Sequence, residues 1–305
     1  MIILEKILSI TKRVQKTIKT IVKFRDHRFR RSLLYTFVVQ KILKIPIVFP
    51  DRNGFHFIVL PEERIDLLFL NGYMGISEIS EQEYSKKVCA PGMIVFDIGA
   101  NIGQFALLFA SLVSPSGRVF AFEPCTETMR RLKANIELNN FKNIITEQVI
   151  VYSLPGKTMK LNIFPPGRSV LNTLGEPAMR VRGRPGVRLE PVQQESVGTV
   201  TIDSYCIEHG IASIDYLKID VEGAELDVLQ GCICMLRDKA IRMIQFEISQ
   251  EMLKGMRRES HEIFTFLNSL GYQCHPISAD AELLPHVQDT NSYFANFIAM
   301  PIVKV

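Results

Sequence analysis

Residues 93–103, Met-Ile-Val-Phe-Asp-Ile-Gly-Ala-Asn-Ile-Gly, join a carboxylate to a glycine turn in a pattern that can hold a ligand. The apolar run ends at Asp97, and Gly99 and Gly103 allow the backbone to turn sharply and approach a ligand without Cβ clashes. A helix is expected over residues 102–113, and its first N–H groups would face a negatively charged or carboxylate-bearing group. The stretch therefore predicts a ligand loop at the carboxyl end of a parallel strand.

A second acid stands twenty residues beyond Gly103. Residues 118–123, Arg-Val-Phe-Ala-Phe-Glu, are expected to form a short strand that ends in Glu123. A carboxylate at that spacing suits a ribose diol, which offers two O–H donors. A dinucleotide loop of the form G-x-G-x-x-G would need glycine where Asn101 and Gln104 stand. The order of strand, loop, helix and acid therefore predicts a nucleoside cofactor that needs no close pyrophosphate approach, with a plain βαβ unit as the alternative.

A third segment carries a family resemblance. Residues 215–226 read Asp-Tyr-Leu-Lys-Ile-Asp-Val-Glu-Gly-Ala-Glu-Leu, preceded by the string Thr-Ile-Asp at 201–203. With the D-x-G-x-N-x-G loop, these strings closely resemble the FkbM-type methyltransferase family. The resemblance implies a class I methyltransferase that uses S-adenosyl-L-methionine (AdoMet) to methylate a hydroxyl oxygen on a saccharide or other small molecule. It implies cofactor contacts from the loop and the acid that follows it: Asp97, Gly99, Asn101, Gly103 and Glu123.

Methyl transfer to a hydroxyl also needs a proton acceptor, because neutral hydroxyls are poor nucleophiles. Asp220 and Glu222 follow one expected parallel strand and Glu247 ends the next, and the carboxyl ends of such strands open on one rim. Asp220 is the first candidate for the base, with capping of the following helix as its structural alternative. Lys218 shares a strand face with Asp220, so it is expected to hold one of these acids ionised or to pair with it for stability.

No metal site or disulfide is expected. Asp220 and Glu247 are two oxygen ligands for a divalent cation, but the spacing offers no third. The six cysteines include no C-x-x-C pair, which favours reduced thiols in a cytoplasmic protein.

The candidate residues need an α/β sheet to bring them together. Strand and helix patterns alternate along the chain, as strands 93–97, 118–122, 144–151, 215–220 and 241–248 and helices 102–113, 126–139, 224–236 and 259–269. This alternation predicts a doubly wound, mostly parallel sheet with helices on both faces. The resemblance adds the seven-stranded, Rossmann-like form of class I methyltransferases.

Three further stretches complete the expected architecture. Residues 272–277 and 293–300 suit an antiparallel closing hairpin, and residues 157–164 suit another hairpin. Residues 165–197, rich in Pro, Gly and Arg, are expected to be a loop, either solvated or acting as a lid for an anionic acceptor.

The N-terminal part is expected to be an extension of this domain. Residues 1–45 place apolar side chains every three or four positions between Lys and Arg, which predicts a basic amphipathic helical extension. Residues 46–90 read as a hairpin and a helix that pack on the core, and 91–305 as the AdoMet-binding methyltransferase domain. The extension is expected to dock on the domain or on a second copy, forming a homo-oligomer, with an anionic membrane surface as the alternative.

Composition narrows the function classes. The net charge is only +4, and no apolar run is long enough for a secretory signal or a membrane span. The protein is therefore expected in the cytoplasm, with peripheral contact at the inner membrane surface as the alternative. A small-molecule or saccharide acceptor is expected, and no nucleic acid, because Asp220-Val-Glu-Gly replaces the Asn/Asp-Pro-Pro-aromatic string of adenine methyltransferases. A nucleic-acid methyltransferase and a non-catalytic AdoMet-binding module docked through the basic N-terminus remain the alternatives.

Overall fold

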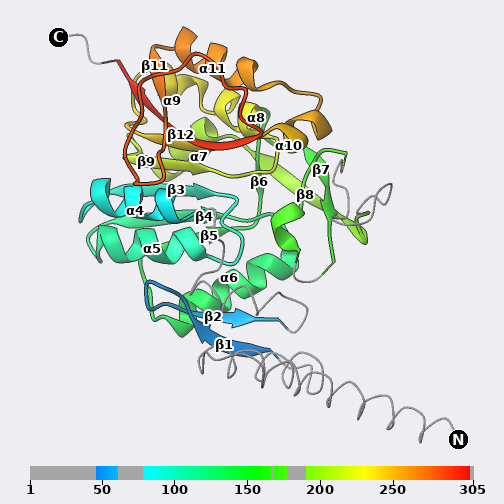
Figure 1. Cartoon of the computed structure of the whole chain (residues 1–305). Coiled ribbons are helices and arrows are strands. Elements are labelled where there is room, and N and C mark those ends of the chain that lie inside the picture. Colours follow the sequence, from blue (N-terminus) through cyan, green and yellow to red (C-terminus); the bar gives the residue numbers. More distant parts are fainter. Residues whose placement is uncertain (1–45, 61–77, 166–167, 177–189, 303–305) are drawn as a thin grey trace, which may run out of the picture. The chain divides into compact units, whose positions relative to one another are not determined.

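The structure is a computed structural model that describes residues 46–60, 78–165, 168–176 and 190–302 (Figure 1). The chain divides at residues 76/77 into two compact units, so the described residues from 78 onward belong to the second. The predicted amphipathic extension, residues 1–45, lies outside the described residues.

The described part of the first unit is a β-hairpin. Strands β1 (Ile47–Pro50) and β2 (His56–Val59) pair antiparallel. The Asp51 carboxylate closes the turn by accepting a 2.9 Å hydrogen bond from the Phe55 N–H, and Gly54 adopts a φ of +87°. The hairpin predicted from the Asn-Gly step is confirmed.

The second unit alternates strands and helices around one large sheet (Figure 1). Its elements are α4 (Ile79–Val88), β3 (Ile94–Ile98), α5 (Gln104–Val113), β4 (Arg118–Phe122), α6 (Thr126–Leu138), β5 (Ile144–Glu147), β6 (Ile150–Val151), β7 (Thr158–Ile163), η2 (Ser169–Leu171), β8 (Gln193–Val200), α7 (Ile202–His209), β9 (Tyr216–Ile219), α8 (Glu225–Gln230), α9 (Ile233–Arg237), β10 (Ile244–Ser249), α10 (Gln250–Gly255), α11 (Ser260–Ser269), β11 (Tyr272–Pro276) and β12 (Phe294–Pro301).

The large sheet has seven strands in the order β11-β12-β10-β9-β3-β4-β5. Strand β12 is antiparallel to both of its neighbours, and the other pairs are parallel. This confirms the predicted fold class, a doubly wound and mostly parallel α/β sheet, and the predicted antiparallel pair at its end.

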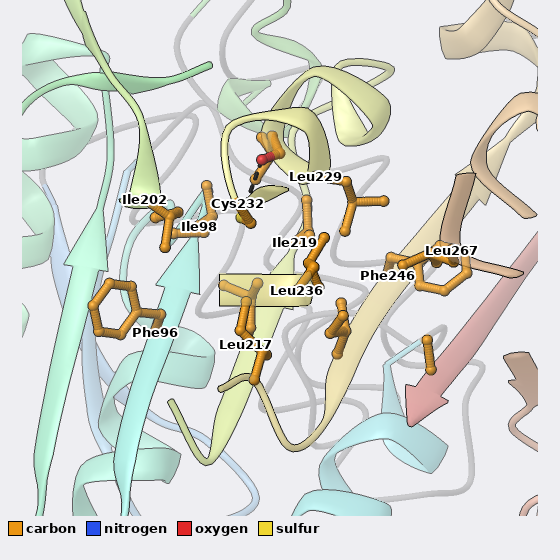
Figure 2. Close-up of a cluster of buried hydrophobic side chains, with 14 of the residues drawn as sticks. Phe96, Ile98, Ile202, Leu217, Ile219, Leu229, Cys232, Leu236, Phe246 and Leu267 are labelled. Atoms are coloured by element: carbon orange, nitrogen blue, oxygen red, sulfur yellow. Dashed lines mark hydrogen bonds between the residues drawn. The ribbon is translucent and has the colours of Figure 1, made fainter. Parts of the chain in front are cut away.

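Alternation along the strands builds one core on each face of the sheet. Phe96, Leu217 and Phe246 point to the face covered by α7, α8, α9 and α11 (Figure 2). Val95 and Tyr216 point to the opposite face, where α4, α5 and α6 pack. Asp97 and Lys218 follow the second alternation, so the polar candidates of these strands lie on the α4–α5 face.

The hairpin predicted over 157–164 is wrong. The residues form a single strand, β7, which pairs antiparallel with β8 some thirty residues later, and β6 completes a separate three-stranded sheet in the order β6-β8-β7. The expected loop 165–197 therefore ends earlier, where β8 begins at Gln193.

Two expected elements are each divided. The strand predicted over 144–151 forms two separate strands, β5 and β6. Strand β5 joins the large sheet and β6 joins the three-stranded sheet. The helix over 224–236 breaks into α8 and α9 at Gly231, where a Cβ would lie 2.3 Å from the carbonyl oxygen of Tyr152. A close backbone contact from a distant segment therefore ends α8, which the local helical pattern does not reveal.

All six cysteines have free thiols. Across the described ranges, none of the helices combines the length and the apolar character that crossing a membrane requires.

Candidate active site

The glycine turn after β3 is packed too closely for any side chain. Gly99 has a φ of +82°, and a Cβ there would lie 1.8 Å from the carbonyl oxygen of Asp220. Gly103 has a φ of +98° and precedes α5, and its Cβ would lie 2.6 Å from Leu132 Cδ1. The turn therefore lies against the end of β9, which brings the first motif and the Asp220 segment together.

Asp97 is fully buried at the end of β3. Neither carboxylate oxygen accepts a hydrogen bond of ordinary geometry from the described residues. Burial raises the pKa of Asp97 to about 6, against the opposing effect of the nearby Lys218 ammonium. A buried carboxylate without a well-aligned donor is a group that a bound cation or N–H donor would stabilise.

Glu123 lies beside the same turn, directly after β4. Its Oε2 accepts the Asn101 N–H at 3.0 Å, and its Oε1 accepts the Cys125 N–H at 3.0 Å. Asn101 adopts a φ of +48°, which asparagine tolerates better than most residues. Burial raises the pKa of Glu123 to about 7, and the two N–H donors partly offset that rise.

Lys218 is the central cation of the α4–α5 face. Its Nζ lies 2.7 Å from Asp220 Oδ2 and 4.5 Å from the centre of the Phe105 ring. In the strand register it stands beside Asp97 on β3 and Gln245 on β10. Burial alone would lower the pKa of Lys218, but the carboxylates of Asp220 and Asp97 and a third acid outweigh it, so the pKa stands above its ordinary value.

A small recess opens beside this ion pair. The predicted residues Lys218, Asp220 and Glu247 line it. Sequence reasoning missed the remaining lining residues, which are Glu78, Glu81, Phe105, Ile219, Gln245 and Asn296.

The sequence pattern could have indicated some of these missed residues but not others. Gln245 precedes Glu247 by two positions on β10, so the strand period alone indicates a shared face. Its Oε1 accepts the Tyr216 hydroxyl at 2.7 Å. Asn296 on β12 is the cross-strand partner of Glu247 on β10, and its side-chain amide donates to the Glu81 carboxylate. Its place at the recess follows only from the strand register, which the sequence pattern does not give.

Carboxyl groups crowd the recess. Burial, then Asp220 and other neighbouring acids, raise the pKa of Glu247 to about 10. Burial raises the pKa of Glu78 to about 7. Glu247 is therefore protonated at neutral pH and offers an O–H donor, whereas Asp220 is ion-paired with Lys218.

Glu222 is held differently from Asp220. It adopts a φ of +54°, its pKa is raised well above the ordinary value by burial, and it is absent from the described lining of the recess. The hydroxyl of Thr173 donates to its carbonyl oxygen at 2.8 Å. Glu225, in the first turn of α8, accepts a hydrogen bond from the Gly223 N–H at 3.1 Å.

The described ranges contain no group of three His, Cys, Asp or Glu side chains arranged to hold a metal ion. The expectation of a metal-independent site stays a prediction.

Comparison with known proteins gives a family match for this chain. The family model of the methyltransferase FkbM domain matches residues 97–274, more than half of the chain. Methyltransferase sdnD of Sordaria araneosa is 34% identical over 186 residues, which cover 52% of this chain and 71% of that protein.

Two other relatives have more specific names. The 31-O-demethyl-FK506 methyltransferase FkbM of Streptomyces tacrolimicus is 33% identical over 156 residues, covering 46% of this chain and 60% of the relative. The 2-O-methyltransferase NoeI of Sinorhizobium fredii is 27% identical over 150 residues, covering 46% and 58%.

Proposed function

Because the chain belongs to the methyltransferase FkbM family, we propose that it transfers a methyl group from AdoMet to a hydroxyl oxygen of a small molecule or saccharide. Methyltransferase activity and AdoMet as cofactor are those of the family. The hydroxyl acceptor is supported by two relatives whose names specify O-methylation and by the carboxylate of Asp220 at the recess. That carboxylate is the observation on which the proposal depends most.

The residues at the glycine turn fit the cofactor. Asp97 is a buried carboxylate that accepts no hydrogen bond of ordinary geometry from the described residues, which suits the positively charged amino group of AdoMet. Gly99 leaves no room for a side chain where the loop meets Asp220. Within the described ranges Glu123 accepts hydrogen bonds from two backbone N–H groups, which leaves lone pairs for the two ribose hydroxyls. Asp97, Gly99, Asn101, Gly103 and Glu123 are therefore the proposed cofactor residues.

When bound, AdoMet supplies a methyl group already activated by a positively charged sulfur. The work left to the chain is to orient the acceptor, exclude water and take the proton of the hydroxyl as its oxygen bonds to the methyl carbon. Lys218 binds Oδ2 of Asp220, so Oδ1 is the atom that accepts this proton. Glu247, protonated at neutral pH, orients the acceptor by donating a hydrogen bond.

The charge of the recess disfavours a nucleic-acid acceptor. Among the described residues that line the recess, Lys218 is the one base, and Glu78, Glu81, Asp220 and Glu247 are the acids. A polyanion gains affinity from Lys and Arg that replace its counterions, but Lys218 is already paired with Asp220. A neutral acceptor rich in hydroxyls meets both donors and acceptors in the same recess.

The cofactor assignment is tested by calorimetry with S-adenosyl-L-homocysteine (SAH), the product of methyl transfer. We expect the wild-type chain to bind SAH and not NAD. An Asp97→Ala, Glu123→Ala double variant loses both proposed polar contacts, so its affinity should fall at least tenfold. SAH binding unchanged in the folded double variant would refute the assignment of these two acids.

The catalytic assignment is tested with Asp220→Asn. The substitution keeps the shape and removes the proton acceptor, so methyl transfer should fall by about 10²–10⁴-fold while SAH affinity stays within a few-fold. Labelled AdoMet is supplied with a panel of monosaccharides, oligosaccharides and polyketide alcohols, and transfer is counted. A rate near that of the wild type would assign Asp220 a structural role and make Glu222 or Glu247 the candidate base.

A further inference from the structure

Residues 168–176, here called the strap, cross from the small sheet to the site. Thr173 pairs with Asn162 of β7 through two backbone hydrogen bonds of 2.9 and 3.3 Å. The Asn162 side chain adds a 2.8 Å hydrogen bond from Nδ2 to the carbonyl oxygen of Gly175. The strap is therefore anchored to β7 by backbone pairing and by a buried side chain.

The same end of the strap packs against α10 without intervening side chains. The Glu176 N–H donates to the Gly255 carbonyl oxygen at 2.9 Å. A Cβ on Gly175 would lie 2.8 Å from the Gly255 carbonyl carbon, and a Cβ on Gly255 would lie 2.5 Å from the Glu176 oxygen. Such close backbone approach fixes residues 173–176 against α10.

From this anchor the strap contacts the acidic turn after β9. Thr173 is 2% exposed, and its hydroxyl donates to the Glu222 carbonyl oxygen at 2.8 Å. The contact holds the positive φ of Glu222, which is two residues beyond Asp220.

The other end of the strap contacts the cofactor loop. In the 3-10 helix η2, the Ser169 hydroxyl donates to Asn101 Oδ1 at 3.0 Å. The Asn101 backbone N–H is already held by Glu123. With Oδ1 turned to the strap, the Asn101 amide has its Nδ2 as the remaining donor on the loop.

We propose that Ser169 is a positioning residue for the cofactor: it fixes the orientation of the Asn101 amide, so that Nδ2 is the donor that Asn101 offers to bound AdoMet. Thr173 anchors the strap that carries Ser169. The proposal rests on the proposed AdoMet site. The strap thereby connects the cofactor loop with the segment that holds the proposed base.

The substitution Ser169→Ala removes one hydrogen bond and leaves the amide free to turn over. Ser169 is partly exposed, so the change empties no core space. The SAH dissociation constant should rise about 3- to 10-fold, as expected for one lost orienting hydrogen bond. Ser169→Thr keeps the hydroxyl and should bind SAH within about twofold of the wild type.

Calorimetry with SAH on the full chain compares these two variants with Asn101→Ala, the Ser169→Ala, Asn101→Ala double variant and Ser196→Ala. Ser196 is an exposed serine of β8 whose hydroxyl accepts from Lys160, so it is a matched control outside the site. If Ser169 acts through Asn101, Ser169→Ala should have no further effect once Asn101 is alanine. The melting temperature without SAH should be the same in Ser169→Ala as in Ser196→Ala.

The anchor has its own pair of variants. Thr173→Val keeps the shape and loses the hydroxyl, so it should weaken SAH binding as Ser169→Ala does, whereas Thr173→Ser should not. If Thr173→Val fails to fold, the Ser169 variants alone decide the proposal.

The outcomes distinguish a failure of the proposed AdoMet site from a failure of the role of Ser169. A wild-type chain that does not bind SAH would overturn the proposed function and this role together. SAH binding by the wild type with equal affinity in Ser169→Ala, or an equal loss with and without the Asn101 side chain, would overturn only the role of Ser169.

Discussion

The carboxyl groups around Lys218 differ in their partners and surroundings, and this difference favours one of them as the base. Burial and the neighbouring acids raise the pKa of Glu247 to about 10, so Glu247 holds a proton at pH 7. Asp220 is ion-paired through Oδ2 at 2.7 Å with Lys218 and lines the recess. The two acids therefore suit different tasks, with Asp220 as proton acceptor and Glu247 as hydrogen-bond donor.

The raised pKa of Glu247 makes stability depend on pH. An acid with a folded-state pKa above its unfolded value binds its proton more tightly when folded, so its contribution to stability falls as pH rises from about 4.5 towards 10. Glu247→Gln removes this loss. The difference in melting temperature between variant and wild type should grow by several degrees from pH 6 to pH 9, since one proton corresponds to at most about 1.4 kcal/mol per pH unit.

Glu208→Gln on α7 is the matched control, because Glu208 is exposed. Its effect on the melting temperature should be nearly the same at both pH values. An equally flat result for Glu247→Gln would show that Glu247 ionises in its ordinary range and would return it to the candidates for the base.

At the scale of elements, the glycine turn after β3 determines how closely the cofactor loop approaches β9. Gly99→Ala adds both strain at a φ of +82° and a Cβ 1.8 Å from the Asp220 carbonyl oxygen. The free energy of unfolding should fall by about 3 kcal/mol or more, measured by urea denaturation. SAH binding should be lost with it, because the loop cannot keep its place.

Gly156→Ala separates the two causes. Gly156 also has a positive φ, +71°, but nothing lies within 4 Å of the added Cβ. Its cost should be the conformational one alone, about 1 kcal/mol. Equal losses in the two variants would show that the contact with Asp220 yields easily and does not hold the loop.

The sequence predicts those elements whose pattern is local. The strand that contains Asp97, the strand that Glu123 follows and the large, mostly parallel sheet are all predicted by apolar runs and turn residues, and the structure contains them. The pairing of β7 with β8 and the strap do not follow. Both depend on contacts between segments far apart in the chain, such as Thr173 with Glu222, which no local period encodes.

At the scale of the whole molecule, the second unit contains all proposed site residues and its own two cores. A chain that begins at Pro46 should therefore fold and bind SAH with wild-type affinity, as circular dichroism and calorimetry would show. Loss of SAH binding by a truncated chain that folds would mean that residues 1–45 take part in the site.

The same truncation tests what the basic segment does. We expect the full chain to self-associate and the truncated chain not to, as light scattering would measure. Sedimentation of the full chain with phosphatidylserine vesicles at low salt, lost at high salt, would instead favour membrane attachment, which depends on roughly 1 kcal/mol per basic residue before screening.

The position of β12 between β10 and β11 has a consequence during synthesis on the ribosome. Strand β10 ends at Ser249, and its partner on that side begins only at Phe294, about 45 residues later. At roughly 5–20 residues per second, β10 waits about 2–9 s with one edge unpaired. An unpaired edge is a template for association between nascent chains. This enzyme therefore completes its sheet late, and the recess gains Asn296 only when that last strand closes it.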